Sequence, residues 1–586
     1  MYDRWSLDVL YSGFDDPKFQ SEFKQLDEYV EKFKTTAETL GTKDERTTTK
    51  EALTLLEESQ KAFGRLINYC ALRQNADTND GDSVSYLGRL IQKNNEITPY
   101  TTAIEKYLAS LKDLDSVIGD DEMLQDYSYY LHEMQKKSKY ILSEDVETAL
   151  GAMDMSGGNA WSDLQGYLTS SVKVDYKGET TTLSSIRNMA YDADPEVRKS
   201  AYEAEIAAYD KIKDAICFSL NSIKMQDLTE CKLRGHASPL DKVLFNSKMQ
   251  RATLDALLEA MKEYMPNFHS YLRAKAESLG HKNGLPWYDI FAPMGKAGGK
   301  VFTAEEAHAY LVEHFESFAP DLAEMVDEAF KNNWIDFYSR PGKSGGAFCS
   351  NLPFLKQSRI LTNFSGSFGS VVTLAHELGH AYHGMMIQDH RPLNTGYTMP
   401  VAETASNFNE LIIVNDAIAK SEGEEKIALI ENQLQDCAQI IVDIYSRFLF
   451  EDEVIRRRKN TFMFAKDLEE IMINAQKEAF GDALDPEYMH PYMWCCKSHY
   501  YSAGLSYYNF PYAFGGLFSR GLYAKYLEEG ESFLPKYRAL LKATTVQNVE
   551  DVALIAGIDL TNPEFWRKSL DVIAEKIDEF IRVTGE

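Results

Sequence analysis

The sequence predicts a mainly α-helical protein. Over most of the 586 residues, apolar side chains recur three or four positions apart, which places them on one face of a helix. Several segments also begin with residues that cap helices, and few alternate apolar and polar residues as strands do. A chain of this length can form two or three domains, or one large domain with a divided core.

The first part of the chain is predicted to consist of several helices. Apolar residues between positions 19 and 33 recur at three- and four-residue steps, and helical patterning continues over residues 53–72, 86–111 and 124–140. Stripes of this kind mostly pack into a core, so they carry no functional signal. The pattern stops at "MDMSGGNAWSDL", which begins at Met153.

A short β-hairpin and a long helix are predicted next. The segment "SSVKVDYKGETTTLSS" alternates and turns at Lys177 and Gly178, which is typical of a hairpin. Asp194 followed by Pro195 is typical of a helix start, because aspartate caps free backbone amides and proline suits the first helical position. We place the main domain boundary between residues 195 and 196.

The segments beyond residue 300 are less uniformly helical. Thr303 and Glu306 match a capping box, so a helix is predicted to start there. The segment "SRILTNF", which begins at Ser358, reads as a strand. The nearby "PGKSGG" is not a phosphate-binding loop, because that motif needs glycine where Phe337 stands.

The strongest functional signal is the segment "VVTLAHELGHAYHGMM". His376 and His380 are four residues apart, so they project from one face of a helix and can share one ion. With Glu377 between them they form the HExxH motif, which is specific for zinc peptidases. Gly379 would let another backbone or a substrate approach closely, and Gly384 is expected to end the helix.

The third ligand of such a site must come from another segment, because catalytic zinc commonly keeps three protein ligands and one open position. The metzincin pattern is excluded, since it needs glycine and histidine where His383 and Met386 stand. A helix predicted to start near Pro400 offers two carboxylates instead. Glu403 and Glu410 lie two turns apart on it, so one can bind the ion while the other holds a ligand histidine.

At these residues the sequence resembles the M3 family of zinc oligopeptidases, in its oligoendopeptidase F branch. The resemblance is carried by "HELGHAYH" and "AETASNFNE", and also by "WSLDVLYSGFDDPKF", "PGKSGGAFCS" and "HYYSAGLSYYNFPYAFGGLF". It implies an N-terminal helical domain over residues 1–195 and a catalytic M3-type metallopeptidase domain over residues 196–586. It also implies a two-lobed, zincin-like helical fold with a deep central channel and a small β element near the active site.

The resemblance further implies a metal site and a catalytic base. One zinc ion per chain would be bound by His376, His380 and Glu403, and Glu410 would support a ligand histidine. Zinc lowers the pKa of its bound water. Glu377 is placed to take a proton from that water and later to deliver it to the leaving amine.

A second set of site residues is implied in the aromatic segment that begins at His499. The family carries a substrate-binding histidine and transition-state-binding tyrosines on a mobile, glycine-containing loop, and His499 matches that histidine. Tyr508 and Tyr512 are the favoured tyrosines, with Tyr501 and Tyr507 as substitutes.

The implied activity is that of a zinc-dependent endopeptidase, which hydrolyses internal bonds of short oligopeptides. The channel would admit unfolded peptides and exclude folded proteins, and the strand near Ser358 would dock a substrate backbone by strand addition. His383 is expected to be structural and to pack behind the metal helix.

Composition limits the partners and the compartment. A formal charge of −28 argues against nucleic acid and anionic membranes, which both need basic patches. The seven cysteines are scattered and odd in number, which favours a reducing compartment. No signal peptide or membrane-spanning run is apparent, so a cytoplasmic protein is expected. The oligomeric state stays open.

Two other functions stay open on the sequence alone. An exopeptidase would need a fixed charged group to hold a peptide terminus, and Arg340, Arg359 and Arg520 are available for that role. A non-catalytic helical scaffold with a structural metal is the other alternative. Glu377 argues against the scaffold, because a structural site has no use for that carboxylate.

Overall fold

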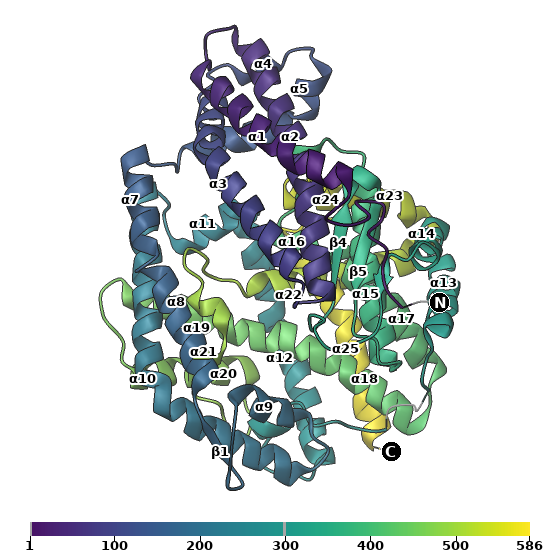
Figure 1. Cartoon of the computed structure of the whole chain (residues 1–586). Coiled ribbons are helices and arrows are strands. Elements are labelled where there is room, and N and C mark those ends of the chain that lie inside the picture. The colour runs from purple at the N-terminus through teal and green to yellow at the C-terminus, as the bar shows by residue number, and fades with distance from the viewer. Residues whose placement is uncertain (1–2, 297–299, 586) are drawn as a thin grey trace. The chain divides into compact units, whose positions relative to one another are not determined.

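Helices dominate the structure, as the sequence predicts (Figure 1). The computed structural model describes residues 3–296 and 300–585. The chain is 71% helical with few strands, so the mainly α-helical fold class is confirmed. Among the described residues, no helix combines the length and the apolar character that crossing a lipid bilayer requires.

The chain divides into two compact units, each assembled from three separate segments. Unit 1 comprises Met1–Lys139, Gly299–Ile413 and Glu529–Ala556, and unit 2 comprises Tyr140–Gly298, Val414–Glu528 and Gly557–Glu586. The boundary predicted between residues 195 and 196 falls inside the first segment of unit 2, and it stays a prediction.

Unit 1 begins with a bundle of long helices. Helices α1, α2 and α3 pack against one another, and Phe19, Leu26 and Phe33 of the predicted stripe are buried. The helices of this unit are α1 (Pro17–Glu38), α2 (Glu45–Ala76), α3 (Gly81–Ala109), α4 (Leu114–Ile118), α5 (Glu122–Asp126), α6 (Ser128–Ser138), α13 (Ala304–Glu316), α14 (Pro320–Lys331), α15 (Phe368–Ile387), α16 (Met399–Ala402), α23 (Leu534–Ala543) and α24 (Val549–Leu554), and α17 (Thr404–Lys420) begins in it. The predicted capping box of Thr303 and Glu306 is present at the start of α13.

A three-stranded sheet lies beside the HExxH helix in unit 1. Its strands are β3 (Ile335–Asp336), β4 (Phe348–Leu352) and β5 (Gln357–Leu361), in the order β3-β5-β4. β5 runs parallel to β3 and antiparallel to β4, and α15 packs on β4 and β5. The strand predicted at "SRILTNF" is therefore confirmed as β5, with its end at Leu361.

The predicted end of the HExxH helix at Gly384 is wrong, because α15 continues to Ile387. Gly384 lies inside the helix, where an added Cβ would be 2.4 Å from the side chain of Asn351 on β4. The glycine is therefore needed for close packing of helix on sheet, not for a C-terminal cap.

The helix predicted from Pro400 is interrupted. It is confirmed near its start as α16, but α16 ends at Ala402 and α17 begins at Thr404. Glu403 is the residue between them, with backbone angles φ −94° and ψ 11°. Glu403 and Glu410 therefore do not belong to one continuous helix.

Unit 2 contains the predicted hairpin and the predicted long helix. β1 (Val174–Tyr176) pairs antiparallel with β2 (Glu179–Thr181), and Asp194 caps α10 with Pro195 at its start. The helices of this unit are α7 (Glu144–Asp154), α8 (Gly158–Ser171), α9 (Leu183–Asn188), α10 (Pro195–Arg234), α11 (Pro239–Asn246), α12 (Arg251–Ser278), α18 (Gly423–Ala438), α19 (Ile444–Arg458), α20 (Ala465–Phe480), α21 (Met493–Cys496), α22 (Phe510–Glu529) and α25 (Pro563–Gly585). A π-helical stretch, Gln439–Asp443, joins α18 to α19.

Candidate active site

Two histidines of α15 and the glutamate between α16 and α17 converge in unit 1. One ligand atom from each of His376, His380 and Glu403 can be chosen so that all three lie within 4.8 Å of one another. Glu403 Oε2 is 3.3 Å from His376 Nε2 and 3.4 Å from His380 Nε2. Within the described residues, this is the one group of three or more such side chains close enough to hold a metal ion.

Neighbouring side chains fix the orientation of these groups. His376 Nδ1 is 2.5 Å from Glu410 Oε1, so a proton is held on Nδ1 and Nε2 is the nitrogen that would bind a cation, with loss of its own proton. Ser406 Oγ donates a hydrogen bond of 2.6 Å to Glu403 Oε2. Glu410 is therefore in contact with a predicted ligand histidine, and its supporting role stays a prediction.

Close packing of α15 against the start of α17 brings the two histidines and Glu403 together. An added Cβ at Gly379 would be 2.5 Å from the Cα of Ser406 and 2.6 Å from the carbonyl oxygen of Ala405, so only glycine fits. Asn409 Nδ2 on α17 donates to the carbonyl of Ala375 on α15 at 3.2 Å. The close approach predicted for Gly379 is therefore confirmed, with α17 as the partner.

Sequence reasoning missed Asn351, which links the sheet to the HExxH helix. Its Nδ2 donates to the carbonyl of His380 at 3.2 Å, and its Oδ1 accepts a hydrogen bond of 2.8 Å from Ser358 Oγ. No local motif marks this residue, because its role depends on β4 lying against α15.

Burial shifts the pKa values of the ionisable groups on α15. It raises the pKa of Glu377 to about 7, with His376 opposing the shift and Glu403 adding to it. Burial lowers the pKa of His380 to about 4. Burial also acts to lower the pKa of His376, but the hydrogen bond and charge of Glu410 outweigh it and raise that pKa to about 9. A carboxyl with a pKa near neutrality suits a group that accepts and returns a proton.

The donor set fits a zinc ion. Ligand atoms about 2.0–2.2 Å from one tetrahedral zinc lie about 3.3–3.5 Å apart, and both distances from Glu403 Oε2 are in that range. Two imidazoles and one carboxylate are also a ligand set that catalytic zinc uses.

The other predicted site residues form a separate cluster in unit 2. The ring centroid of His499 is 4.8 Å from that of Tyr508 and 5.9 Å from that of Tyr512, and the two tyrosine rings are 5.6 Å apart. All three side chains are partly exposed. Burial and the nearby cations Arg447 and Lys497 lower the pKa of His499. The histidine is therefore neutral at pH 7 and can donate or accept a hydrogen bond.

The two substitute tyrosines are engaged elsewhere. Tyr501 is fully buried and donates to the carbonyl of Trp494 at 2.8 Å. Tyr507 is 2% exposed and donates to Asp452 Oδ1 at 2.7 Å. Tyr501 and Tyr507 are thus buried side chains, whereas Tyr508 and Tyr512 are partly exposed, which suits the latter two better for contact with a substrate.

His383 lies in the core of unit 1. It is fully buried, its ring stacks on Tyr397 with centroids 4.2 Å apart, and its Nε2 contacts Thr544 Oγ1 at 2.8 Å. Burial lowers the pKa of His383 to about 3, so it is neutral. These contacts are those of a packed core side chain.

Comparison with known proteins identifies the family. The model described as Peptidase family M3 matches residues 188–572, and the one described as Oligopeptidase F matches residues 108–173. The chain belongs to peptidase family M3. Membership of that family, together with its oligoendopeptidase relatives, makes it a metalloendopeptidase.

Curated relatives match along nearly the whole chain. Oligopeptidase PepF of Bacillus subtilis is 26% identical over 591 aligned residues, which cover 98% of this chain and 86% of that protein. The oligoendopeptidase F homolog of Mycoplasma pneumoniae is 24% identical and covers 96% of this chain and 95% of its own length. The resemblance drawn from the motifs is confirmed.

Solved structures share the fold. A Chlamydophila abortus protein superimposes with a TM-score of 0.84 at 19% identity, covering 99% of this chain and 98% of its own. Oligoendopeptidase-F from Enterococcus faecium superimposes with a TM-score of 0.69 at 18% identity, covering 97% and 98%. At these identities the likeness establishes the fold alone.

Proposed function

We propose that the chain is a zinc-dependent endopeptidase that hydrolyses internal peptide bonds of short oligopeptides. The observation that carries the proposal is the convergence of His376, His380 and Glu403 at zinc-ligand distances, with Glu377 adjacent. The names of the curated relatives, oligopeptidase and oligoendopeptidase F, support the same substrate class. We assign one zinc ion to each chain.

His376, His380 and Glu403 would hold the zinc ion, which would supply acidification of a water molecule and polarisation of the peptide carbonyl. Glu377 is the general base that accepts a proton from the attacking water and then returns it to the leaving amine. Glu410 keeps the tautomer of His376 fixed throughout.

We assign substrate binding to the cluster in unit 2. His499 would contact the substrate, and Tyr508 and Tyr512 would donate hydrogen bonds to the oxygen that becomes negative as the carbonyl is attacked. A donor of this kind contributes about 2.7–4 kcal/mol to transition-state stabilisation. The partial exposure of these three residues supports the assignment.

Cleavage from a peptide terminus is the weaker reading. The three arginines considered for an exopeptidase are committed to other groups. Arg340 pairs with Asp336, with contacts of 2.6 and 2.9 Å, and Arg520 donates to the carbonyl of Gly516 at 2.9 Å. Arg359 is fully buried and donates to the carbonyls of Ser6 and Ser358.

The cytoplasm is the proposed compartment of the protein, because the seven cysteines are scattered along the chain, as is typical of a reducing compartment.

The substitution Glu377→Gln tests the mechanism. It keeps the size of the side chain but removes the base, so we expect one zinc per chain by elemental analysis and a loss of hydrolysis of about 100- to 10,000-fold. The substrate is a peptide blocked at both ends, which an exopeptidase leaves intact. Hydrolysis at a rate close to wild type would contradict the role of Glu377, and an intact blocked peptide with the wild-type chain would contradict endopeptidase activity.

A further inference from the structure

A cavity of about 620 Å³ in unit 2 has no part in the mechanism above. It is lined by residues of α9 and α10, by Gln439 at the start of the π-helical stretch Gln439–Asp443, and by Met493, Cys496 and Lys497. Ligand sites typically have volumes of ~300–1,000 Å³, and π-helical turns are frequent at functional sites. The cavity therefore has the size and the setting of a binding site.

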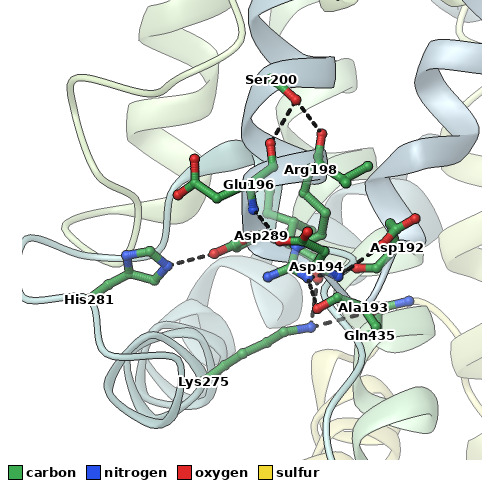
Figure 2. Close-up of polar contacts among 12 residues, drawn as sticks. Asp192, Ala193, Asp194, Glu196, Arg198, Ser200, Lys275, His281, Asp289 and Gln435 are labelled. Atoms are coloured by element: carbon green, nitrogen blue, oxygen red, sulfur yellow. Dashed lines mark hydrogen bonds and ion pairs between the residues drawn. The ribbon is translucent and has the colours of Figure 1, made fainter. Parts of the chain in front are cut away.

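Arg198 lines this cavity, and the hydrogen-bond donors on its Nη2 have no partner among the described residues. The side chain is 3% exposed, its Nε donates to Asp289 Oδ1 at 2.6 Å, and its Nη1 donates to the carbonyls of Asp192 and Ala193 at 2.7 and 3.0 Å (Figure 2). Within the described residues, no acceptor contacts Nη2. Nη2 is not one of the fully buried atoms that lack a partner, so it is open to the cavity, where a ligand acceptor can receive its hydrogen bond.

Three further donors line the cavity. Gln435 accepts a hydrogen bond from Lys275 at Oε1, which leaves its Nε2 without a partner in the described part of the chain. The side chains of Gln439 and Lys497 make no hydrogen bond or ion pair with any described residue. Burial lowers the pKa of Lys497, and a carboxylate close by would favour its charged form.

The acidic residues that line the cavity form no hydrogen bond or ion pair with these donors among the described residues. Glu205 lies 3.5 Å from Arg187 Nε and 3.4 Å from His490 Nε2, so its charge is already matched. Asp436 is exposed. The remaining wall is aromatic and includes Tyr202, Trp287, Tyr288 and Phe291. The lining therefore favours a ligand that joins a negatively charged acceptor to an apolar group.

We propose that this cavity binds the free carboxyl terminus of a peptide, with the terminal side chain against the aromatic wall. The proposal rests on the proposed function, because peptides are the substrates and Lys497 precedes His499 by only two residues. Guanidinium and ammonium groups form stronger hydrogen bonds with a carboxylate than with a neutral amide. A peptide that ends in a carboxamide should therefore bind less tightly than the same peptide as the free acid.

The test compares one peptide in two forms. The probe is a seven-residue peptide, acetylated at its amino end and ending in leucine, as the free acid and as the carboxamide. Binding is measured by calorimetry on the zinc-loaded chain with Glu377→Gln, so that hydrolysis does not consume the probe. We expect the acid to bind at least tenfold more tightly than the amide. Equal affinities would overturn the proposal.

Three variants in the same background locate the binding group. Lys497→Met should remove most of the preference for the acid, and Gln439→Glu should reverse or abolish it by repulsion. Lys466→Met removes the same charge from an exposed position on α20 outside the cavity and should leave the preference intact. A preference that survives both cavity substitutions would contradict the assignment.

A small acid separates a peptide site from a site for organic acids in general. 4-Methylpentanoate carries the carboxylate and side chain of leucine, so its competition with the acid peptide supports the site. Binding of 4-methylpentanoate without any binding of the acid peptide would overturn the assignment to peptides. A chain that prefers the acid but hydrolyses no peptide contradicts the proposed function, whereas a chain that hydrolyses peptides but binds acid and amide equally contradicts the carboxylate site alone.

Discussion

Glu410 controls how His376 presents its ring, although it lies outside the group of three ligand atoms. Its Oε1 lies 2.5 Å from His376 Nδ1 and accepts the hydrogen bond of that nitrogen, so Nε2 is the nitrogen that would bind a cation. Removing such a supporting group typically weakens metal binding 10- to 100-fold, because the ligand loses both its orientation and its basicity.

We therefore expect Glu410→Ala to lower the affinity for zinc about 10- to 100-fold in a competition titration with a chelating dye. The zinc affinity of Glu410→Gln should fall between those of Glu410→Ala and the wild type, since glutamine keeps a hydrogen-bond acceptor but loses the charge. Glu313→Ala, at an exposed position on α13, is the matched control and should bind zinc normally. An unchanged affinity in Glu410→Ala would mean that the contact with His376 has no role in metal binding.

For His383, which lies only three residues after His380, we predict a loss of stability without a loss of zinc. Its full burial, its stacking on Tyr397 and its contact with Thr544 predict that His383→Ala costs about 2–4 kcal/mol of unfolding free energy. The zinc content should stay at one ion per chain. Denaturant unfolding and elemental analysis measure both, and a loss of zinc at full stability would identify His383 as a ligand.

The sequence could predict those parts of the site that depend on local geometry. His376, Glu377 and His380 share a helix, so their spacing alone brings them together. Glu403 is on another segment, and spacing left the choice between it and Glu410 open; the family resemblance decided it. Asn351 comes from a strand that precedes the helix, and nothing in its neighbourhood along the chain marks its contact with the carbonyl of His380.

At the scale of elements, the site depends on how closely α15 and α17 pack. In Gly379→Ala the new methyl group would lie 2.5 Å from a backbone atom of α17, so one helix must shift. We expect lower thermal stability and weaker zinc binding, because the shift separates Glu403 from the two histidines. Thermal unfolding with and without added zinc measures both effects.

Gly64→Ala is the control for this substitution. Gly64 lies in α2, and no atom is within 4 Å of the Cβ that would be added there. The same exchange should therefore stabilise the chain, by about 0.5–1 kcal/mol, through the higher helix propensity of alanine. If both variants behaved alike, close packing at Gly379 would not control the geometry of the site.

Helix starts were predictable from the sequence, whereas helix ends and interruptions were not. The caps at Asp194 and Thr303 use side chains within three residues of the amides they bind, so a short motif is sufficient. The sequence wrongly predicts a helix end at Gly384, because the side chain that packs on it, that of Asn351, is distant in sequence. The interruption at Glu403 likewise has no local signal, since the surrounding apolar spacing is helical throughout.

At the scale of the whole molecule, the predicted boundary at residue 195 can be tested by cutting the chain there. A fragment of residues 196–586 would lack α7, α8 and the β-hairpin, although α8 and β1 pack on α10 within unit 2. We expect this fragment to unfold without a cooperative transition, because the apolar face of α10 loses its cover. Circular dichroism during heating provides the measurement, with the full chain as the control. A cooperative transition would support residues 196–586 as a domain.

The division of each unit into three segments also bears on how the chain is made. Both units receive their last segment from the stretch that begins at Glu529, so a ribosome must translate well beyond that residue before either core is complete. Domains usually fold one after another as they emerge from the exit tunnel. Here the nascent polypeptide instead keeps apolar surface of both units unburied until these last segments have been made, so we expect co-translational folding of either unit to be late.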